Sequence, residues 1–386
     1  MPIDSTGKIL DFARQWSQKL PEYSAQFEQE RRLSAEISNE FANAGVYHML
    51  VPEEYGGLEL HPRDFVQVLK LLSTGDGSAG WNAMIGGTTG VLSASLPDEF
   101  ARKIYADKPG VMTVGVTAPI GRSDVVEGGY RVSGRWPFGS GSQNADWICG
   151  GCFIYKNGEQ VMGKHGPESQ LMMFEASQVN IEDTWDVAGL KGTGSHHFNV
   201  KDVFVPTGRS VILGARARVQ RPLYQFPLLG LLALGVSSVS LGLGYKALSA
   251  FKDLAGVKTP TGARRKLIDR PAVQSDVAKS VADLESAEAY INFTIDNAWA
   301  LANQGEKLSL AHKGKLRLAA VNATRRSVAA VDRLYQLGGG SSIYENNVLQ
   351  QCLRDIHVTT QHIMVASPIF ELTGKVELGI DPRQPL

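Results

Sequence analysis

Cysteine is scarce in this chain, whose 386 residues include three. So few cysteines cannot form the disulfide framework that stabilises many secreted domains, and their number favours a reducing compartment. The first residues, MPIDS, also lack the basic and apolar start of a secretory signal. From these two absences we expect a cytoplasmic protein.

Net charge is also missing, because 39 Lys and Arg residues balance 39 Asp and Glu residues. Such a chain has no bulk electrostatic attraction for nucleic acid or for a membrane surface. Residues 226–251 form one apolar run that is long enough to cross a bilayer. The run stands alone and contains Ser237, Ser238, Ser240 and Lys246. We therefore interpret it as a helix buried in a bundle or a subunit interface, and we expect neither nucleic acid nor a membrane as partner.

Several motifs of known chemistry are absent too. The sequence contains no P-loop, no G-x-S-x-G nucleophile elbow and no H-E-x-x-H zinc motif. Its G-x-G at Gly192 does not lead from a strand into a helix, as a Rossmann fingerprint would. Cys149 and Cys152 have C-x-x-C spacing, but they lie in a predicted strand, where residues three apart point to opposite faces. No second pair completes a zinc site, so the sequence predicts no metal.

The spacing of apolar residues divides the chain into three parts. Residues 1–109 repeat them every three to four positions, which predicts a helical domain. Residues 110–210 show short alternating segments between turns, which predicts an antiparallel β-barrel or sandwich. Residues 211–386 contain four long helical patterns, which predict an antiparallel four-helix bundle whose last helix covers about residues 347–372. The predicted fold class is therefore α+β.

One stretch stands out as a candidate ligand site. Residues 136–147 read WPFGSGSQNADW, with small hydroxyl residues among glycines and aromatic residues on both sides. Glycine lets a ligand approach the backbone, the aromatic rings offer a flat apolar wall, and Ser140 or Ser142 offers one donor. This combination suits a planar ring with one polar edge. A plain hairpin whose aromatic residues pack in a core is the alternative.

Three further segments have two interpretations each. Residues 192–195, GTGS, suit contact with an anion or a ring, or form a plain β-turn. Arg354 and His357 share a face of the last predicted helix, with His362 further along it; the simplest interpretation is a buried histidine of the bundle. The basic cluster at residues 264–270 suits a phosphate or a solvated helix end.

Together, three segments carry a family resemblance over essentially the whole chain. They are WDVAGLKGTGS at 185–195, VFVP at 203–206, and QLGG at 336–339 followed by Arg354-Asp355. With them the chain resembles the acyl-CoA dehydrogenase superfamily. The W-x-F-x-S-G segment at 136–141, and residues 349–357 followed by His362, are similar to its flavin-dependent monooxygenase branch. Many acyl-CoA dehydrogenases place a catalytic glutamate soon after the Arg-Asp pair, and residues 361–364 offer no carboxylate base there.

The resemblance implies the oxygenase component of a two-component monooxygenase. Such an enzyme receives reduced FMN or FAD by diffusion from a separate NAD(P)H-flavin reductase. It hydroxylates a small aromatic or heteroaromatic substrate with O2 through a flavin C4a-hydroperoxide, and we expect a homotetramer. Two alternatives stay open. One is an acyl-CoA dehydrogenase or flavin oxidase with tightly bound FAD, and the other is a non-catalytic homologue acting as a binding subunit.

The resemblance also implies residue roles. Ser140 would bond the flavin near N5, and His362 would deprotonate the substrate or protonate the leaving hydroxide. Water would be excluded by Trp136, Phe138 and Trp147. The other cofactor contacts implied are Ser142, Thr117, Thr193, Ser195, Arg264, Gly338 and Gly339, and the substrate pocket implied is Trp81, Thr88, Thr89 and His357.

One departure from the branch concerns the helix after Trp81. Aromatic hydroxylases of this branch carry a substrate-facing histidine there, whereas residues 86–90 read GGTTG. The resemblance therefore gives no phenol-deprotonating base on this helix. Either the substrate needs no such base, or His362 serves alone.

Overall fold

The computed structural model describes residues 5–164 and 166–386 of the chain. Residues 1–4, which belong to the start where the sequence lacks a secretory signal, lie outside the described residues. The N-terminal region is helical, with α1 (Ser5–Lys19), α2 (Ser24–Glu30), α3 (Ala35–Asn43), α4 (Pro62–Gly75), α5 (Gly77–Gly90) and α6 (Asp98–Ala101). Asp76 separates α4 from α5, because its Oδ1 accepts the Ala79 N–H at 3.0 Å and so caps α5.

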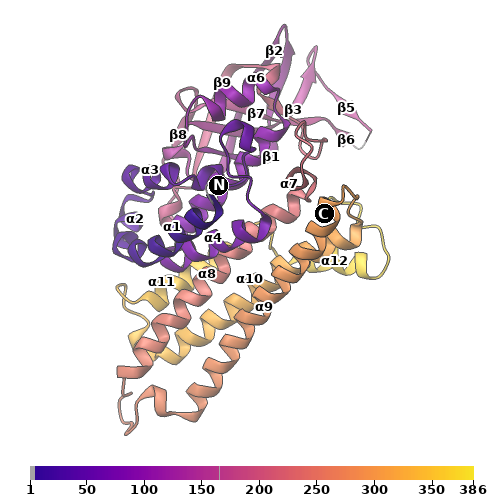
Figure 1. The fold of residues 1–386 in the computed structure, drawn as a ribbon. Coiled ribbons are helices and arrows are strands. Elements are labelled where there is room, and N and C mark those ends of the chain that lie inside the picture. The colour runs from indigo at the N-terminus through magenta and orange to yellow at the C-terminus, as the bar shows by residue number, and fades with distance from the viewer. Residues whose placement is uncertain (1–4, 165) are drawn as a thin grey trace.

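The middle region is one large sheet with the strand order β10-β7-β3-β1-β2-β9-β8 (Figure 1). Its strands are β1 (Thr113–Val126), β2 (Gly129–Gly139), β3 (Trp147–Lys156), β7 (Ser169–Glu175), β8 (Asn180–Glu182), β9 (His196–Pro206) and β10 (Ser210–Val211). Short β4 (Glu159–Gln160) pairs with β3, and β5 (Met162–Gly163) pairs with β6 (Gly166–Pro167). The predicted β-domain is confirmed, and its sheet is mostly antiparallel. The β1–β3 pair is parallel, and the described strands form an open path from β10 to β8.

Trp136 lies at the centre of this sheet and is fully buried. A Cβ atom placed on Gly121, Gly134 or Gly150 would lie 2.3, 2.5 or 2.6 Å from its indole, so these glycines make room for the ring. The ring stacks on Phe198 with ring centres 5.2 Å apart, and its Nε1–H donates to the Gly151 carbonyl of β3 at 2.8 Å. The prediction that Trp136 forms the wall of a cofactor site is therefore wrong, because the sheet encloses its ring.

The C-terminal region is a bundle in which α8 (Leu228–Val257), α9 (Pro271–Asn303) and α10 (Leu310–Gly338) run side by side (Figure 1). The short α7 (Pro222–Gln225) precedes it. The predicted last helix, 347–372, is wrong, since it consists of α11 (Val348–Thr359) and α12 (Pro368–Glu377). Proline lacks the N–H of a continuing helix and opens α12. His362 therefore lies in the turn between the two helices.

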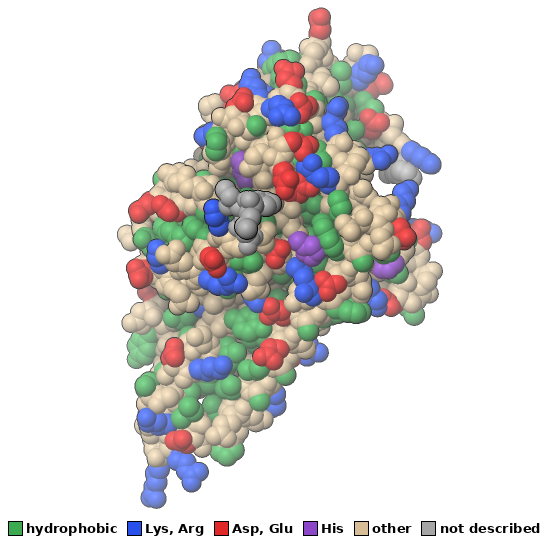
Figure 2. Space-filling model, viewed as in Figure 1, with side chains coloured by type: hydrophobic (Ala, Val, Ile, Leu, Met, Phe, Trp, Pro, Cys, Tyr) green, Lys and Arg blue, Asp and Glu red, His purple; other side chains and the backbone are tan. Residues whose placement is uncertain are grey.

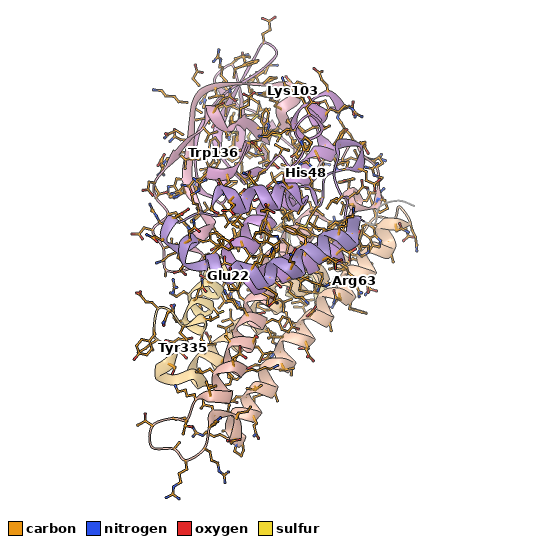
Figure 3. All side chains as sticks on the ribbon, turned by 60° about the vertical axis from the view of Figure 1, so that its left-hand side comes forward. Glu22, His48, Arg63, Lys103, Trp136 and Tyr335 are labelled. Atoms are coloured by element: carbon orange, nitrogen blue, oxygen red, sulfur yellow. The ribbon has the colours of Figure 1, made fainter. Side chains whose placement is uncertain are left out.

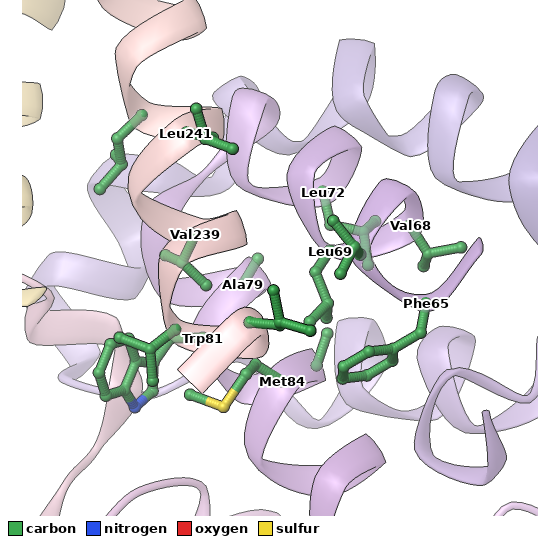
Figure 4. Packing of buried hydrophobic residues seen from close by; sticks show 14 of the residues in the cluster. Phe65, Val68, Leu69, Leu72, Ala79, Trp81, Met84, Val239 and Leu241 are labelled. Carbon is green, nitrogen blue, oxygen red and sulfur yellow. The ribbon is translucent and has the colours of Figure 1, made fainter. Parts of the chain in front are cut away.

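Helix α8 has the length and hydropathy of a membrane span, and 78% of its most apolar window is buried inside the protein. Small residues let α5 and α4 approach it closely. A Cβ atom on Gly235 would lie 2.9 Å from Met84 of α5, and one on Gly242 would lie 2.4 Å from Ser73 of α4. Figure 4 shows Trp81 and Met84 of α5 beside Val239 of α8. The predicted burial of residues 226–251 in a bundle is confirmed.

The three regions meet at the loop between β8 and β9. Asp355 of α11 accepts the Leu190 N–H at 2.6 Å, and Arg354 donates to the Ala188 carbonyl at 2.6 Å. Arg354 also pairs with Glu28 of α2 at 2.8 Å. Gly189 is the residue that lets the loop lie on α11, because a Cβ atom there would be 2.4 Å from the Arg354 carbonyl group. The Arg-Asp pair of the sequence thus clamps this loop, which we name the clamp loop (residues 185–195).

The element types change close to the predicted boundaries, so residues 1–109, 110–210 and 211–386 remain our proposed domains. Charges of both signs are interspersed over the face shown in Figure 2.

Candidate active site

A chain of buried hydroxyl groups joins α5 to the two loops that leave and enter the sheet. Trp81 Nε1 donates to Ser140 Oγ at 3.1 Å, and Ser140 Oγ lies 2.6 Å from Ser195 Oγ. Ser195 Oγ lies 2.7 Å from Thr193 Oγ1, which donates to the Leu190 carbonyl at 2.8 Å. All four side chains are less than a tenth exposed. Four of the predicted site residues therefore meet in one network.

The direction of every proton in this network follows from its two ends. The indole N–H is only a donor, and the Leu190 carbonyl is only an acceptor. Because Thr193 gives its proton to Leu190, Ser195 must donate to Thr193, and Ser140 must donate to Ser195. A hydroxyl group has one donor and two acceptor positions. Ser140 Oγ thus donates its proton to Ser195 and accepts the Trp81 N–H with one lone pair. Its second lone pair remains available as an acceptor.

The backbone around Ser140 is unusual. Phe138 has a φ of 65° and Gly141 has a φ of 73°, both in the left-handed region. Such a conformation is costly for phenylalanine, and residues of this kind concentrate at functional sites. The Gly141 N–H donates to the Thr193 carbonyl at 2.9 Å, which joins this loop to the clamp loop. The Phe138 ring is 65% exposed, with its neighbour Trp185 6.4 Å away, so it is available to cover a flat ligand.

Two polar atoms next to Ser140 are buried without a partner among the described residues: Ser142 Oγ and Gln143 Oε1. Buried polar atoms are nearly always bonded, so these two fit contact with a bound molecule. Gln143 also lines a cavity of about 280 Å³, together with Glu30, Arg31, Ile181, Asp183 and His196. The residues present thus fit a polar ligand edge at this loop.

His362 packs edge-on against Trp81, with ring centres 5.5 Å apart. Its Nδ1 accepts the Met364 N–H at 3.3 Å, so the neutral ring carries its proton on Nε2. Burial, and then the charge of Arg317, lower the pKa of His362 to about 4. The imidazole is therefore neutral at pH 7 and offers an Nε2–H donor beside Trp81.

The other predicted substrate-pocket residues do not join this cluster. The hydroxyls of Thr88 and Thr89 bond carbonyls of the preceding turn of α5, both at 2.7 Å. His357 is exposed and pairs with Asp332 of α10 at 2.9 Å. Its assignment to the pocket is not supported by this placement.

The remaining predicted cofactor residues lie elsewhere in the chain. Thr117 is exposed on β1, and Arg264 is exposed in the loop before α9. The Gly338 carbonyl accepts a bond from Lys258 Nζ at 2.6 Å, and Gly339 follows it at the end of α10. In Figure 3, Tyr335 of α10 lies in the lower half of the molecule, whereas Trp136 lies in the upper half. Within one chain, Arg264, Gly338 and Gly339 are therefore distant from Ser140.

Trp147, expected to exclude water, packs against Arg209 at 4.7 Å in a separate cluster between the N-terminal helices and the sheet. No group of three or more metal-ligating side chains occurs in residues 5–164 and 166–386.

Sequence reasoning missed Arg317 altogether and gave Asp355 no role. A signal for Arg317 exists. It lies on α10 at helical spacing from the buried residues Ala320, Val321 and Thr324, so it is a charge within a buried face. For Asp355 no local signal exists, because its partner Leu190 is 165 residues away in sequence.

The comparisons with known proteins identify the family. The family model for the acyl-CoA dehydrogenase N-terminal domain matches residues 6–98, and the model for the acyl-CoA dehydrogenase C-terminal domain matches residues 234–367. Indole-3-acetate monooxygenase of Pseudomonas putida is 33% identical over 92% of this chain and 90% of its own length. The oxygenase subunit HsaA of Mycobacterium tuberculosis, a flavin-dependent monooxygenase, is 28% identical over 91% of this chain and 90% of its own length. This chain is a flavin-dependent monooxygenase of the acyl-CoA dehydrogenase superfamily.

A solved structure of this kind is similar throughout. XiaF from Streptomyces sp., in complex with FADH2 and glycerol, superimposes with a TM-score of 0.92 at 25% identity, covering 98% of this chain and 97% of that one. The predicted family, three-part fold and enzyme class are therefore confirmed. A reduced flavin as cofactor, with O2 as co-substrate, is confirmed for this family.

Proposed function

We propose that this protein is the oxygenase component of a two-component monooxygenase that hydroxylates a small aromatic or heteroaromatic compound. A separate NAD(P)H-flavin reductase would supply the reduced flavin. The names of its relatives support both the aromatic substrate and the two-component system. They include an indole-3-acetate monooxygenase and the oxygenase component of an FADH2-dependent resorcinol hydroxylase from Rhizobium sp., which is 28% identical over 93% of this chain.

The observation that carries the proposal is the free acceptor position of Ser140. A reduced flavin has an N–H group at N5, whereas an oxidised flavin has only a lone pair there. An oxygen atom that retains an acceptor position and no proton suits the reduced form. The hydroxyl network is therefore built to receive reduced flavin rather than oxidised flavin.

Each residue of the cluster then has a separate task. When bound, reduced flavin supplies the electrons with which one atom of O2 enters the substrate and the other leaves as water. Ser140 would hold the proton at N5, and Trp81 keeps Ser140 oriented by its N–H bond. Phe138 would cover the ring and exclude water. His362, with its proton on Nε2, would donate to an oxygen atom of the substrate or of the leaving hydroxide.

The direct test mixes the protein with reduced FMN or FAD without oxygen and then adds ¹⁸O-labelled O2 and an aromatic compound. Indole-3-acetate, indole and resorcinol form a suitable first panel. We expect ¹⁸O in a hydroxylated product, measured by mass spectrometry. A protein that instead retains oxidised FAD, is reduced by an acyl-CoA and ignores supplied reduced flavin would be a dehydrogenase, which contradicts the proposal.

A second prediction concerns the pH dependence of the reaction. Because the pKa of His362 is lowered to about 4, the ring stays neutral at pH 5 to 8, and we expect no loss of kcat/KM through this residue in that range. A histidine with an ordinary pKa would change its charge near pH 6.5, and the rate would change with it inside this range. Replacing His362 with Leu should lower kcat by about 100-fold. The readout is the initial rate of product formation from pH 5 to 8.

His357 offers the matched control, because it is an exposed histidine of α11 with no contact to the cluster. His357→Leu should retain the wild-type rate. Full turnover in His362→Leu at every pH would assign the proton donor to another group.

We further propose a cytoplasmic homotetramer. Arg264, Gly338 and Gly339 are predicted to contact the cofactor, yet they lie far from Ser140 in the same chain, so one flavin held by both groups needs two copies. A mass of four chains in light scattering supports this assembly, and a stable monomer contradicts it. The described cysteines are all free and buried, which suits a reducing compartment.

A further inference from the structure

Arg317 is a buried cation that has no anionic partner among the described residues. Its side chain, on α10, is 3% exposed, and its Nε has no partner among the described residues. Its Nη2 donates a long hydrogen bond to the Met364 carbonyl at 3.5 Å. No Asp or Glu of residues 5–164 and 166–386 forms an ion pair with it. An unpaired buried charge is costly, so this arrangement calls for an anion from outside the described residues.

The other arginines of α10 all have side-chain partners. Arg325 donates to Ser367 Oγ at 2.8 Å. Arg326 and Arg333 both pair with Asp283 of α9, at 3.1 and 3.0 Å. Arg317 is the arginine of this helix that is both buried and without a side-chain partner.

Arg317 also borders the candidate active site. Met364 accepts the bond from Arg317 through its carbonyl, and its N–H donates to His362 Nδ1 at 3.3 Å. His362 contacts Trp81, which donates to Ser140. A continuous series of contacts thus leads from the unpaired guanidinium to the hydroxyl network.

We propose that Arg317 binds the carboxylate of an anionic aromatic substrate and so selects aromatic acids over neutral aromatic compounds of the same shape. This inference rests on the proposed function and adds the substrate class. The free Nε–H and an adjacent Nη–H of a guanidinium point in parallel, which matches the two oxygens of a carboxylate. The aromatic part of the substrate then lies towards Trp81 and His362, where hydroxylation takes place.

The test compares indole-3-acetate with indole-3-acetamide, which has nearly the same shape and no charge. Dissociation constants are measured by calorimetry without oxygen, on the protein loaded with reduced flavin. We expect the wild-type protein to bind the acid at least about 10-fold more tightly than the amide. Arg317→Met should weaken binding of the acid by about 30-fold or more and leave the amide unchanged, because one member of a buried charge pair is lost. Arg317→Lys should recover part of the difference.

Arg326→Met is the matched control, since it removes a paired surface arginine from the same helix and should change neither constant. Equal binding of acid and amide by the wild-type protein would overturn the proposal, even if Arg317→Met does not fold. Equal weakening of both ligands by Arg317→Met would also overturn it, because the arginine would then not distinguish the carboxylate. A variant that changes only the oligomeric mass would do so too, because the anion would then come from a neighbouring copy of the chain.

Failure of the proposed function has a different signature. In that case no aromatic compound gives a hydroxylated product, whereas the acid–amide comparison still reports on Arg317. In steady-state turnover, the effect of Arg317→Met should appear in KM for the acid, which should rise by the same factor as the dissociation constant.

Discussion

Ser140→Ala is expected to lower the product formed per reduced flavin by about 10- to 100-fold while oxygen consumption continues. The substitution removes the acceptor oxygen proposed for N5–H and leaves the Trp81 N–H and the Ser195 hydroxyl without their shared partner. Electrons from the flavin should then appear as hydrogen peroxide. The measurement is the ratio of hydroxylated product to oxygen consumed, with peroxide assayed in parallel.

The control for this result is another buried serine outside the network. Ser238 of α8 donates to the Leu234 carbonyl at 2.6 Å, and Ser238→Ala removes a hydroxyl of the same size. It should keep the wild-type ratio. An unchanged ratio in Ser140→Ala, together with wild-type flavin affinity, would show that another group holds N5, with Ser142 as the next candidate.

Asp355→Ala is expected to lower the free energy of unfolding by about 2–4 kcal/mol. The change leaves the buried Leu190 N–H without an acceptor and opens space between α11 and the clamp loop. Asp355→Asn retains an acceptor oxygen and most of the volume, so it should cost clearly less. Denaturant unfolding at pH 7 measures both variants, and an equal loss in Ala and Asn would show that the hydrogen bond to Leu190 is unimportant.

The same carboxyl group should make stability depend on pH. Burial, opposed by the Leu190 N–H and reinforced by the charge of Asp76, raises the pKa of Asp355 to about 7 from 3.8. The folded protein therefore holds a proton that the unfolded chain has lost. This contribution to stability is fully present below about pH 4 and disappears as the pH rises through 7, a change on the order of 2–4 kcal/mol.

His362 titrates in the opposite sense, because its lowered pKa costs stability as the pH falls from 6.5 towards 4. The two effects oppose each other in the wild-type curve. The informative quantity is the difference between the wild type and Asp355→Asn, measured from pH 5 to 8. That difference should shrink as the pH rises, and a constant difference would place the pKa of Asp355 outside this range.

Local patterns of apolar residues predicted the three-part fold, but they could not show that the Trp136 ring is enclosed in the sheet. The alternation of β2 puts Trp136 on the side of Val132, which the structure shows to be the core side. The glycines that accommodate its ring come from β1 and β3 as well as β2, and strand register cannot be obtained from one sequence. The turn at His362 was missed although Pro368 marked the start of the next helix.

The site depended on the family resemblance for Ser140, Thr193 and Ser195, since a small hydroxyl residue near glycine is common in turns. Their hydrogen bonds to each other join residues up to 59 positions apart, counting Trp81. No helical or strand period connects such positions. Only the folded chain reveals the one-way order of the protons.

That order has a consequence for the speed of the chemistry. Free hydroxyl groups rotate, and in water they must turn to meet each new charge. Here the three rotors of Ser140, Ser195 and Thr193 are already fixed by the Trp81 donor at one end and the Leu190 carbonyl at the other. Their entropy is lost during folding, before any flavin binds, so little reorganisation remains when the reaction begins.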